Sequence, residues 1–143
     1  MTKRVLLDTN IILDVLFRWK EWVENSGGVW GAHVKNDIAA YVTATTVTDI
    51  FYVVRRQINL ETARDAVTKI LQSLEVVAVD QGVLFYANQL AGNDFEDNVQ
   101  IACVVKAKLD AIVTRDKTGF KLATVPVLLP GELLAQIQAE KEG

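Results

Sequence analysis

Short apolar runs alternate with amphipathic stretches along the whole chain, and this alternation is the feature that most limits its fold. The runs at 5–7 and 110–114 are nearly continuous in apolar residues, as strands buried on both faces of a sheet are. Further strands are expected at 38–42, 75–80 and 124–130, with helical spacing between them. Strands that alternate with helices form a parallel sheet covered on both faces. We therefore expect an α/β fold around a mostly parallel sheet of four to five strands.

Cap residues and helix breakers predict where the helices begin and end. The expected caps are, in chain order, Thr45 or Thr46, Asn59, Asp80, and Asn93 or Asp94. Pro130 suits the first turn of a terminal helix. The stretch 20–37 keeps helical spacing, but Gly27 and Gly28 weaken a helix, so we expect a kink or break at that point.

Length and composition bound the domain count and the compartment. The chain has 143 residues, of which half are hydrophobic and only two are prolines. That is the size of one domain, so residues 1–143 are expected to form a single domain. No apolar run is long enough to cross a bilayer, and Asp8 interrupts the first apolar run too early for a signal peptide. We expect a cytoplasmic protein that does not contact membranes.

Few side chains other than carboxylates are available for chemistry. Cys103 is the single cysteine, which rules out an intrachain disulfide and a thiolate metal cluster. His33 is the single histidine, which rules out a zinc site with several histidine ligands. The net charge of −3 is unlike that of a basic nucleic-acid-binding module. Catalysis must therefore rest mainly on carboxylates.

Four aspartates fall where a parallel sheet would gather them. Asp8 follows the first strand, and Asp116 follows the strand at 110–114. Ligands of such sheets bind at the carboxyl ends of the strands. Asp49 and Asp97 lie in helices whose apolar faces should pack on the sheet, and Asp94 lies one turn before Asp97. Each acid taken alone also fits a cap or a turn, so the functional interpretation depends on the set.

A cluster of four carboxylates needs cations. Two such charges about 5 Å apart repel by roughly 3 kcal/mol at an effective dielectric constant near 20. Ligands that are all oxygen suit Mg²⁺ or Mn²⁺, and two such ions together promote phosphodiester cleavage. Arg115 and Lys117 flank Asp116, where they either hold a substrate phosphate or are ordinary solvated loop charges.

Three segments resemble the motifs of PIN domains, close to the VapC-like toxins of toxin–antitoxin modules. They are "LLDTNIILD", "TATTVTDIFYVVRR" and "DFEDNVQIACVVKAKLDAIVTRDKTGF". The resemblance implies a PIN-like α/β/α sandwich with Asp8, Asp49, Asp97 and Asp116 as the catalytic, metal-binding set. The implied supporting residues are Asn10 and Thr114. The third motif offers both Asp94 and Asp97 as its acid; we favour Asp97 because it directly precedes the apolar helical run, and we expect Asp94 to have a supporting role as a helix cap or outer-shell residue. The second acid is commonly glutamate in the family, and here it is Asp49.

The resemblance also implies an activity and partners. Family members are Mg²⁺- or Mn²⁺-dependent ribonucleases that are often dimeric and often inhibited by a cognate antitoxin. The expected function is therefore a metal-dependent endoribonuclease acting on RNA. Apolar stretches at 51–54 and 84–86 are the expected homodimer interface.

Two other functions compete with the ribonuclease. One is a non-catalytic binding or regulatory module that keeps the same fold. The other is a phosphatase of the haloacid dehalogenase type with Asp8 as the nucleophile. That chemistry needs a second aspartate two positions on, where this chain has Asn10.

Overall fold

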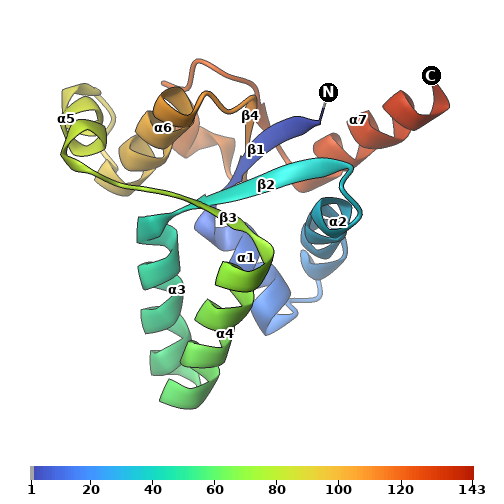
Figure 1. Ribbon diagram of the computed structural model, residues 1–143, viewed down its shortest axis with the longest axis horizontal. Coiled ribbons are helices and arrows are strands. Elements are labelled where there is room, and N and C mark those ends of the chain that lie inside the picture. The colour runs from blue at the N-terminus through green and yellow to red at the C-terminus, as the bar shows by residue number, and fades with distance from the viewer. Residues whose placement is uncertain (1) are drawn as a thin grey trace.

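The computed structural model describes residues 2–143, and its centre is a sheet of five parallel strands (Figure 1). The strands are β1 (Lys3–Leu7), β2 (Ile38–Thr43), β3 (Glu75–Val77), β4 (Ala111–Val113) and β5 (Val127–Leu128). They lie in the order β3-β2-β1-β4-β5, and every pairing is parallel. The expected sheet is confirmed, although β3 and β5 are shorter than the apolar runs that contain them.

Seven α-helices and one short 3₁₀ helix complete residues 2–143. They are α1 (Thr9–Phe17), α2 (Val23–Val34), α3 (Ala44–Gln57), α4 (Leu60–Ser73), α5 (Gln81–Gln89), α6 (Phe95–Ala107), η1 (Lys117–Phe120) and α7 (Pro130–Glu142). In Figure 1, α5 and α6 lie together on one side of the sheet, whereas α3 and α4 extend from the other. No helix in this range is long and apolar enough to cross a membrane.

The strands divide the core into two layers because successive side chains of a strand point to opposite faces. Val5 and Leu7 of β1 join the apolar cluster that contains residues of α1, α2, α3, α4 and α7. Leu6 joins a second cluster with Ile101 of α6 and Ile112 of β4. All three β1 side chains are fully buried, and each such burial contributes about 1.5–3 kcal/mol. The fold is thus a sheet covered by helices on both faces.

The helix caps agree with the sequence at all but one point. Asn59 caps α4 by accepting from the Thr62 amide at 2.7 Å, and Asp80 caps α5 in the same way. The cap expected at Thr45 or Thr46 is wrong, because Thr43 occupies that place. Thr43 Oγ1 accepts from the Thr46 amide at 3.0 Å. Thr43 is also the last residue of β2, so α3 begins directly where its strand ends.

The break expected in the second helix is absent, and α2 continues through Gly27 and Gly28. Tertiary packing accounts for the difference. A Cβ at Gly28 would lie 2.9 Å from Cδ1 of Leu134, so the glycine allows α7 to approach closely. Contact with a neighbouring helix stabilises a segment whose own helix propensity is low.

One edge of the sheet brings together chain segments that are far apart in sequence. Beyond the last residue of β1, the Asp8 amide donates to the Val113 carbonyl at 2.9 Å. The Thr114 amide in turn donates to Leu128 of β5 at 2.9 Å. Asp8 caps α1 and Thr43 caps α3, so both helices begin at the carboxyl ends of their strands. This is the edge where a ligand site is expected.

Candidate active site

Asp8 is a nearly buried carboxylate with three hydrogen-bond donors. Its exposed fraction is 9%. Oδ1 accepts from the Thr9 amide at 2.7 Å and from Gln100 Nε2 at 2.9 Å. Oδ2 accepts from Thr114 Oγ1 at 2.8 Å. The donors come from α1, from α6 and from the residue after β4, so three elements fix the orientation of this anion.

Thr114 connects Asp8 to Asp116. Its hydroxyl donates to Asp8 and accepts from the Asp116 amide at 3.1 Å. The Asp116 side chain is exposed, and its Oδ1 accepts from the Thr118 amide at 3.0 Å and from Thr118 Oγ1 at 2.6 Å. These donors lower the pKa of Asp116 below its usual value. The carboxylate therefore stays charged and held at the start of η1.

Asp97 lies within the electrostatic reach of the same acids. Burial, followed by the charges of Asp94, Asp8 and Asp116, raises the pKa of Asp97 to about 6. Gly119 packs directly against the Asp97 carboxylate, because a Cβ at that position would overlap Asp97 Oδ2. Asp94 Oδ1 accepts from the Asp97 amide at 3.1 Å, so Asp94 caps α6 while it adds charge to the group.

A second pair of acids, Asp49 and Glu96, extends this group toward α3. A hydrogen bond with Asp49 is the largest of the effects that raise the pKa of Glu96 to about 8; burial and the charges of Asp49, Asp8 and Asp94 add to it. Asp49 Oδ2 is buried without a hydrogen-bond partner. Protonated Glu96 supplies a donor for Asp49, which ionised Glu96 cannot do. Thr9 Oγ1 contacts Thr46 Oγ1 at 2.9 Å and Glu96 Oε1 at 3.5 Å.

The four aspartates expected from the sequence therefore fall into two linked groups. The charges of Asp8 and Asp116 both act on Asp97, and the charges of Asp49 and Asp8 both act on Glu96. Among residues 2–143, no three His, Cys, Asp or Glu side chains already surround one point as metal ligands. The edge is thus a row of carboxylates rather than a closed cage.

The donor set nevertheless fits a hard divalent cation. Asp49 Oδ2 and Gln100 Oε1 are buried acceptors without a hydrogen-bond partner. Two further carboxyl groups have raised pKa values. The largest cause is a hydrogen bond with Asp49 for Glu96 and burial for Asp97, and the charges of neighbouring acids add to both shifts. A cation beside these oxygens would offset both the missing donors and the repulsion. Mg²⁺ suits such a site because it usually binds one or two carboxylates and keeps several waters.

The two basic residues beside Asp116 are both paired with acids. Arg115 Nε lies 3.1 Å from Oδ2 of fully buried Asp14, although its N–H is not aligned for a hydrogen bond. This pairing turns the guanidinium toward Asp14, and the phosphate contact expected for Arg115 stays a prediction. Lys117 Nζ lies 2.7 Å from Glu132 Oε1 in a half-exposed pair. Such surface pairs are weak, so Lys117 is free to exchange partners.

Asn10 lies beside this loop rather than among the acids. Its Oδ1 accepts a long hydrogen bond from the Arg115 amide, at 3.5 Å. The contact places Asn10 against the loop that carries Asp116, and its supporting role stays a prediction.

Sequence reasoning missed Glu96, Gln100 and Thr118. Glu96 and Gln100 are four residues apart, so they share one face of α6. Gln100 is the polar residue within the otherwise apolar run 99–104, and that exception is a signal that was present in the sequence. Thr118 follows Asp116 at the spacing of a side chain that donates within a turn.

The single histidine and cysteine have structural surroundings. His33 Nδ1 accepts from the Ala40 amide at 3.0 Å, and its other ring nitrogen contacts the Ser73 carbonyl. Cys103 is fully buried, and burial with the charge of Asp80 raises its thiol pKa to about 11. A thiol with so high a pKa is a poor nucleophile at neutral pH.

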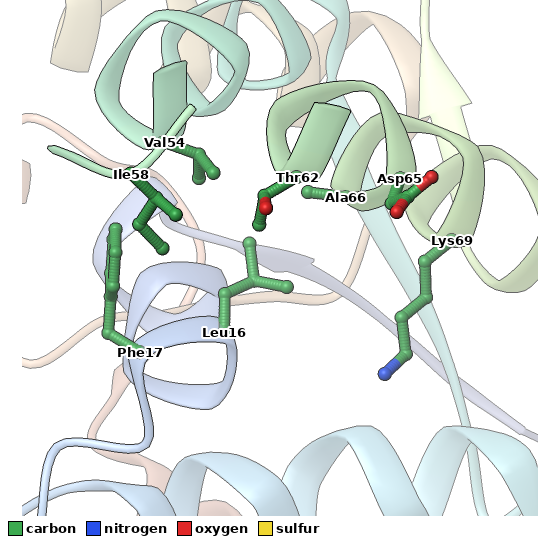
Figure 2. Close-up of a pocket in the computed structure, with 8 residues that line it drawn as sticks. All are labelled: Leu16, Phe17, Val54, Ile58, Thr62, Asp65, Ala66 and Lys69. Atoms are coloured by element: carbon green, nitrogen blue, oxygen red, sulfur yellow. The ribbon is translucent and has the colours of Figure 1, made fainter. Parts of the chain in front are cut away.

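An apolar cavity of about 180 Å³ lies between α1, α3 and α4, with Asp65 and Lys69 of α4 in its lining (Figure 2). Leu16 and Phe17 face Val54 and Ile58 across it, and Thr62 and Ala66 line the α4 side. None of the acids described above lines this cavity.

Comparisons with known proteins agree with the fold. The family model described as PIN domain matches residues 4–118. No curated protein sequence matches the chain. DNA-bound VapBC from Salmonella typhimurium gives a TM-score of 0.67 at 15% identity, over 89% of this chain and 97% of that one. FitAcB from Neisseria gonorrhoeae gives a TM-score of 0.61 at 21% identity, over 89% of this chain and 98% of that one.

A third similar structure is VapC20 from Mycobacterium tuberculosis, described as a toxin that cleaves the sarcin-ricin loop. It gives a TM-score of 0.66 at 11% identity, over 80% of this chain and 91% of that one. At such identities these structures establish a shared fold only. The family model spans most of the chain, and on that basis the protein belongs to the PIN domain family.

Proposed function

We propose that this protein is a VapC-like endoribonuclease that uses Mg²⁺ or Mn²⁺ to cleave RNA. The observation that carries the proposal is the convergence of Asp8, Asp97 and Asp116 at the carboxyl edge of the sheet, with Asp49 and Glu96 alongside. Carboxylates this close oppose one another unless cations are bound. The solved toxin from Mycobacterium tuberculosis, which is described as cleaving an RNA loop, shares the fold and supports RNA as the substrate class.

The residues of this chain have separate tasks in that proposal. Divalent cations at these oxygens would activate water and neutralise charge on the scissile phosphate. Asp8, fixed by three donors, and Asp116, held by Thr118, offer charged oxygens without rearrangement. Asp97 offers an oxygen once its proton leaves. Glu96 keeps a proton near neutral pH and shares it with Asp49 until a cation replaces it.

The test is cleavage of a structurally mixed RNA pool with Mg²⁺, with Mn²⁺ and with EDTA. Asp97→Asn should lower the rate by orders of magnitude while the protein stays folded. Glu75→Gln is the matched control, since it removes one negative charge from an exposed residue of β3. Cleavage in EDTA, or full activity of Asp97→Asn, would refute the metal mechanism. An inert wild type would favour the non-catalytic binding module instead.

The proposed protein partner is a cognate antitoxin. Solved neighbours from Klebsiella pneumoniae and Salmonella typhimurium are described as a toxin-antitoxin complex and as VapBC. Apolar side chains of such a partner would bind in the apolar cavity of Figure 2. Coexpression with the protein of an adjacent short gene should give a stable complex that suppresses cleavage. Ile58→Asp should weaken that complex without changing the activity of the free enzyme.

The proposed assembly is a homodimer. Each of the two stretches expected at the interface has an exposed aromatic side chain: Tyr52 in 51–54 is 60% exposed and Phe85 in 84–86 is 62% exposed. Val54, in the first stretch, is instead buried in the core. Leu84, Phe85 and Phe95 border a surface hollow of about 290 Å³. Sedimentation at micromolar concentration should show a dimer, and Phe85→Glu should produce monomers. A wild-type monomer would contradict the assignment.

A further inference from the structure

The turn that follows α1, residues 18–22, presents two tryptophans on a compact backbone. Arg18 ends α1 with φ at 54°, a left-handed conformation that residues with a Cβ seldom adopt. The Trp22 amide then donates to the Trp19 carbonyl at 3.0 Å, and the Val23 amide donates to the same carbonyl at 2.8 Å. The two indoles are therefore carried by a defined turn, which we call the tryptophan turn.

The tryptophans belong to a row of planar groups. The rings of Phe17 and Trp19 stack with centroids 5.6 Å apart and planes 14° from parallel. The guanidinium carbon of Arg115 lies 5.6 Å from the Trp19 ring and 4.8 Å from the Trp22 ring. A cation at that range is attracted to the ring face. The row therefore combines flat apolar surface with the guanidinium of Arg115, whose charge is paired with Asp14.

Both indoles remain open to solvent. Trp19 is 39% exposed and Trp22 38% exposed, whereas Trp30 in α2 is only 8% exposed. With Lys20 and Glu21 they line a surface hollow of about 330 Å³. Proteins bind single-stranded nucleic acid with exposed aromatic side chains beside basic ones, because the bases stack on the rings and the basic side chains contact the phosphates.

The position of the row connects it to the acids. Arg115 follows Thr114, which holds Asp8, and precedes Asp116. On the turn itself, Arg18 and Lys20 are exposed cations and Glu21 is an exposed anion, which leaves one net positive charge. Because Arg115 lies over both tryptophans and directly precedes Asp116, a strand that extends from the acid edge along Arg115 would reach the turn with Arg18 and Lys20. This combination of charge and flat surface favours RNA over an apolar protein segment.

We propose that the tryptophan turn is a base-stacking subsite for single-stranded RNA whose scissile phosphate lies at the acid edge. This inference rests on the proposed ribonuclease function and adds where the strand is held. It assigns Trp22 and Trp19 to base contact and Lys20 to a phosphate.

The first experiment uses tryptophan fluorescence in the Asp116→Asn protein with Mg²⁺, so that bound RNA is not cut. A short single-stranded RNA of mixed sequence should quench the emission, because bases stack on the exposed indoles while Trp30 stays covered. A strand of the same length without bases should quench much less. Equal quenching by both strands would overturn the proposal, because phosphate contact alone would then explain binding.

The second experiment replaces the ring. Trp22→Leu keeps apolar bulk but removes the aromatic face, so it should raise the Kd for single-stranded RNA about tenfold or more. In the active protein the same change should raise KM with little effect on kcat. Trp22→Phe should restore most of the affinity. Leu71→Ala, an exposed apolar change on α4, is the control and should alter neither value.

The outcomes separate this inference from the proposed function. If wild type cuts RNA but Trp22→Leu binds and cuts it equally well, the subsite is wrong and the ribonuclease stands. If Trp22→Leu loses a protein partner but binds RNA normally, the turn is a protein-docking surface. If wild type fails to cut any RNA yet binds single strands through the turn, the ribonuclease is wrong. Trp19→Leu and Lys20→Ala repeat the test should Trp22→Leu be unstable.

Discussion

Asp14 and Arg115 join the end of α1 to the loop that carries Asp116. The Asp14 carboxylate is fully buried, and its Oδ2 lies 3.1 Å from Arg115 Nε and 2.8 Å from Ser26 Oγ. Its other oxygen has no partner. Burial raises the pKa of Asp14, and the Ser26 hydrogen bond and the Arg115 charge oppose that shift. The pair therefore holds the loop that carries Asp116 against α1, and it does so with a charge that is buried in the protein.

Arg115→Met should destabilise the protein strongly, because it leaves the Asp14 charge buried without a cation. Breaking such a pair typically costs about 3–5 kcal/mol, and partial exposure of Arg115 puts this case near the lower end. Urea denaturation at neutral pH measures the loss. The double variant Asp14→Asn with Arg115→Met should recover much of it, since asparagine still accepts from Ser26 without carrying charge. A double variant as unstable as the single one would contradict this account.

The metal-free protein should lose stability as the pH rises from about 5 to 9. The pKa of Asp97 is raised to about 6 and that of Glu96 to about 8, so the folded form keeps protons that the unfolded form has released. Their stabilising effect is complete below the unfolded pKa values and disappears as the pH passes each folded value. Melting temperatures across this range in EDTA test it.

Two controls accompany the pH series. Glu96→Gln should remove the part of the loss in stability that occurs near pH 8, because that part comes from Glu96. Mg²⁺ should raise the melting temperature more at pH 8 than at pH 6, because at pH 6 it must displace protons. The lowered pKa of Asp116 acts in the opposite sense, and only in the acidic range below these values. A flat curve in EDTA would contradict the raised pKa values of Glu96 and Asp97.

The sequence predicted the sheet and the edge, but not how the acids pair there. Asp8 and Asp116 follow strands, and the carboxyl ends of parallel strands share an edge, so their meeting was predictable. Glu96 is not predictable in the same way, because an acid in the first turn of a helix usually interacts only with the helix dipole. Its partner Asp49 lies on a different helix, and only tertiary structure brings the two together.

Arg115 is a second residue whose partner could not be predicted from the sequence. Its place beside Asp116 suggested a phosphate contact, but the side chain reaches back to Asp14, which the sequence gives no reason to bury. Gly28 was expected to weaken α2, and the helix continues because α7 packs on the glycine. In each case a long-range contact overrides the local signal.

Gly27→Ala should stabilise the protein. Gly27 is helical, and an added Cβ would meet nothing within 4 Å. Alanine at an unstrained helical position contributes about 0.5–1 kcal/mol relative to glycine. Thermal denaturation should show a higher melting temperature. Gly28→Ala is the matched comparison and should gain less, because its Cβ would lie 2.9 Å from Leu134 Cδ1. Equal gains at both positions would show that α7 adjusts freely.

Gly119→Ala should impair the site while leaving the fold intact. A Cβ at this position would overlap Asp97 Oδ2, so the carboxylate must shift from its position in the site. Because ligand placement within about 0.5 Å governs such sites, Mn²⁺ affinity and RNA cleavage should both fall at least about tenfold. Titration calorimetry with Mn²⁺ measures the first and a cleavage assay the second. Gly31→Ala, which meets nothing within 4 Å, controls for the added methyl. Normal Mn²⁺ binding by Gly119→Ala would mean that Asp97 is not a ligand.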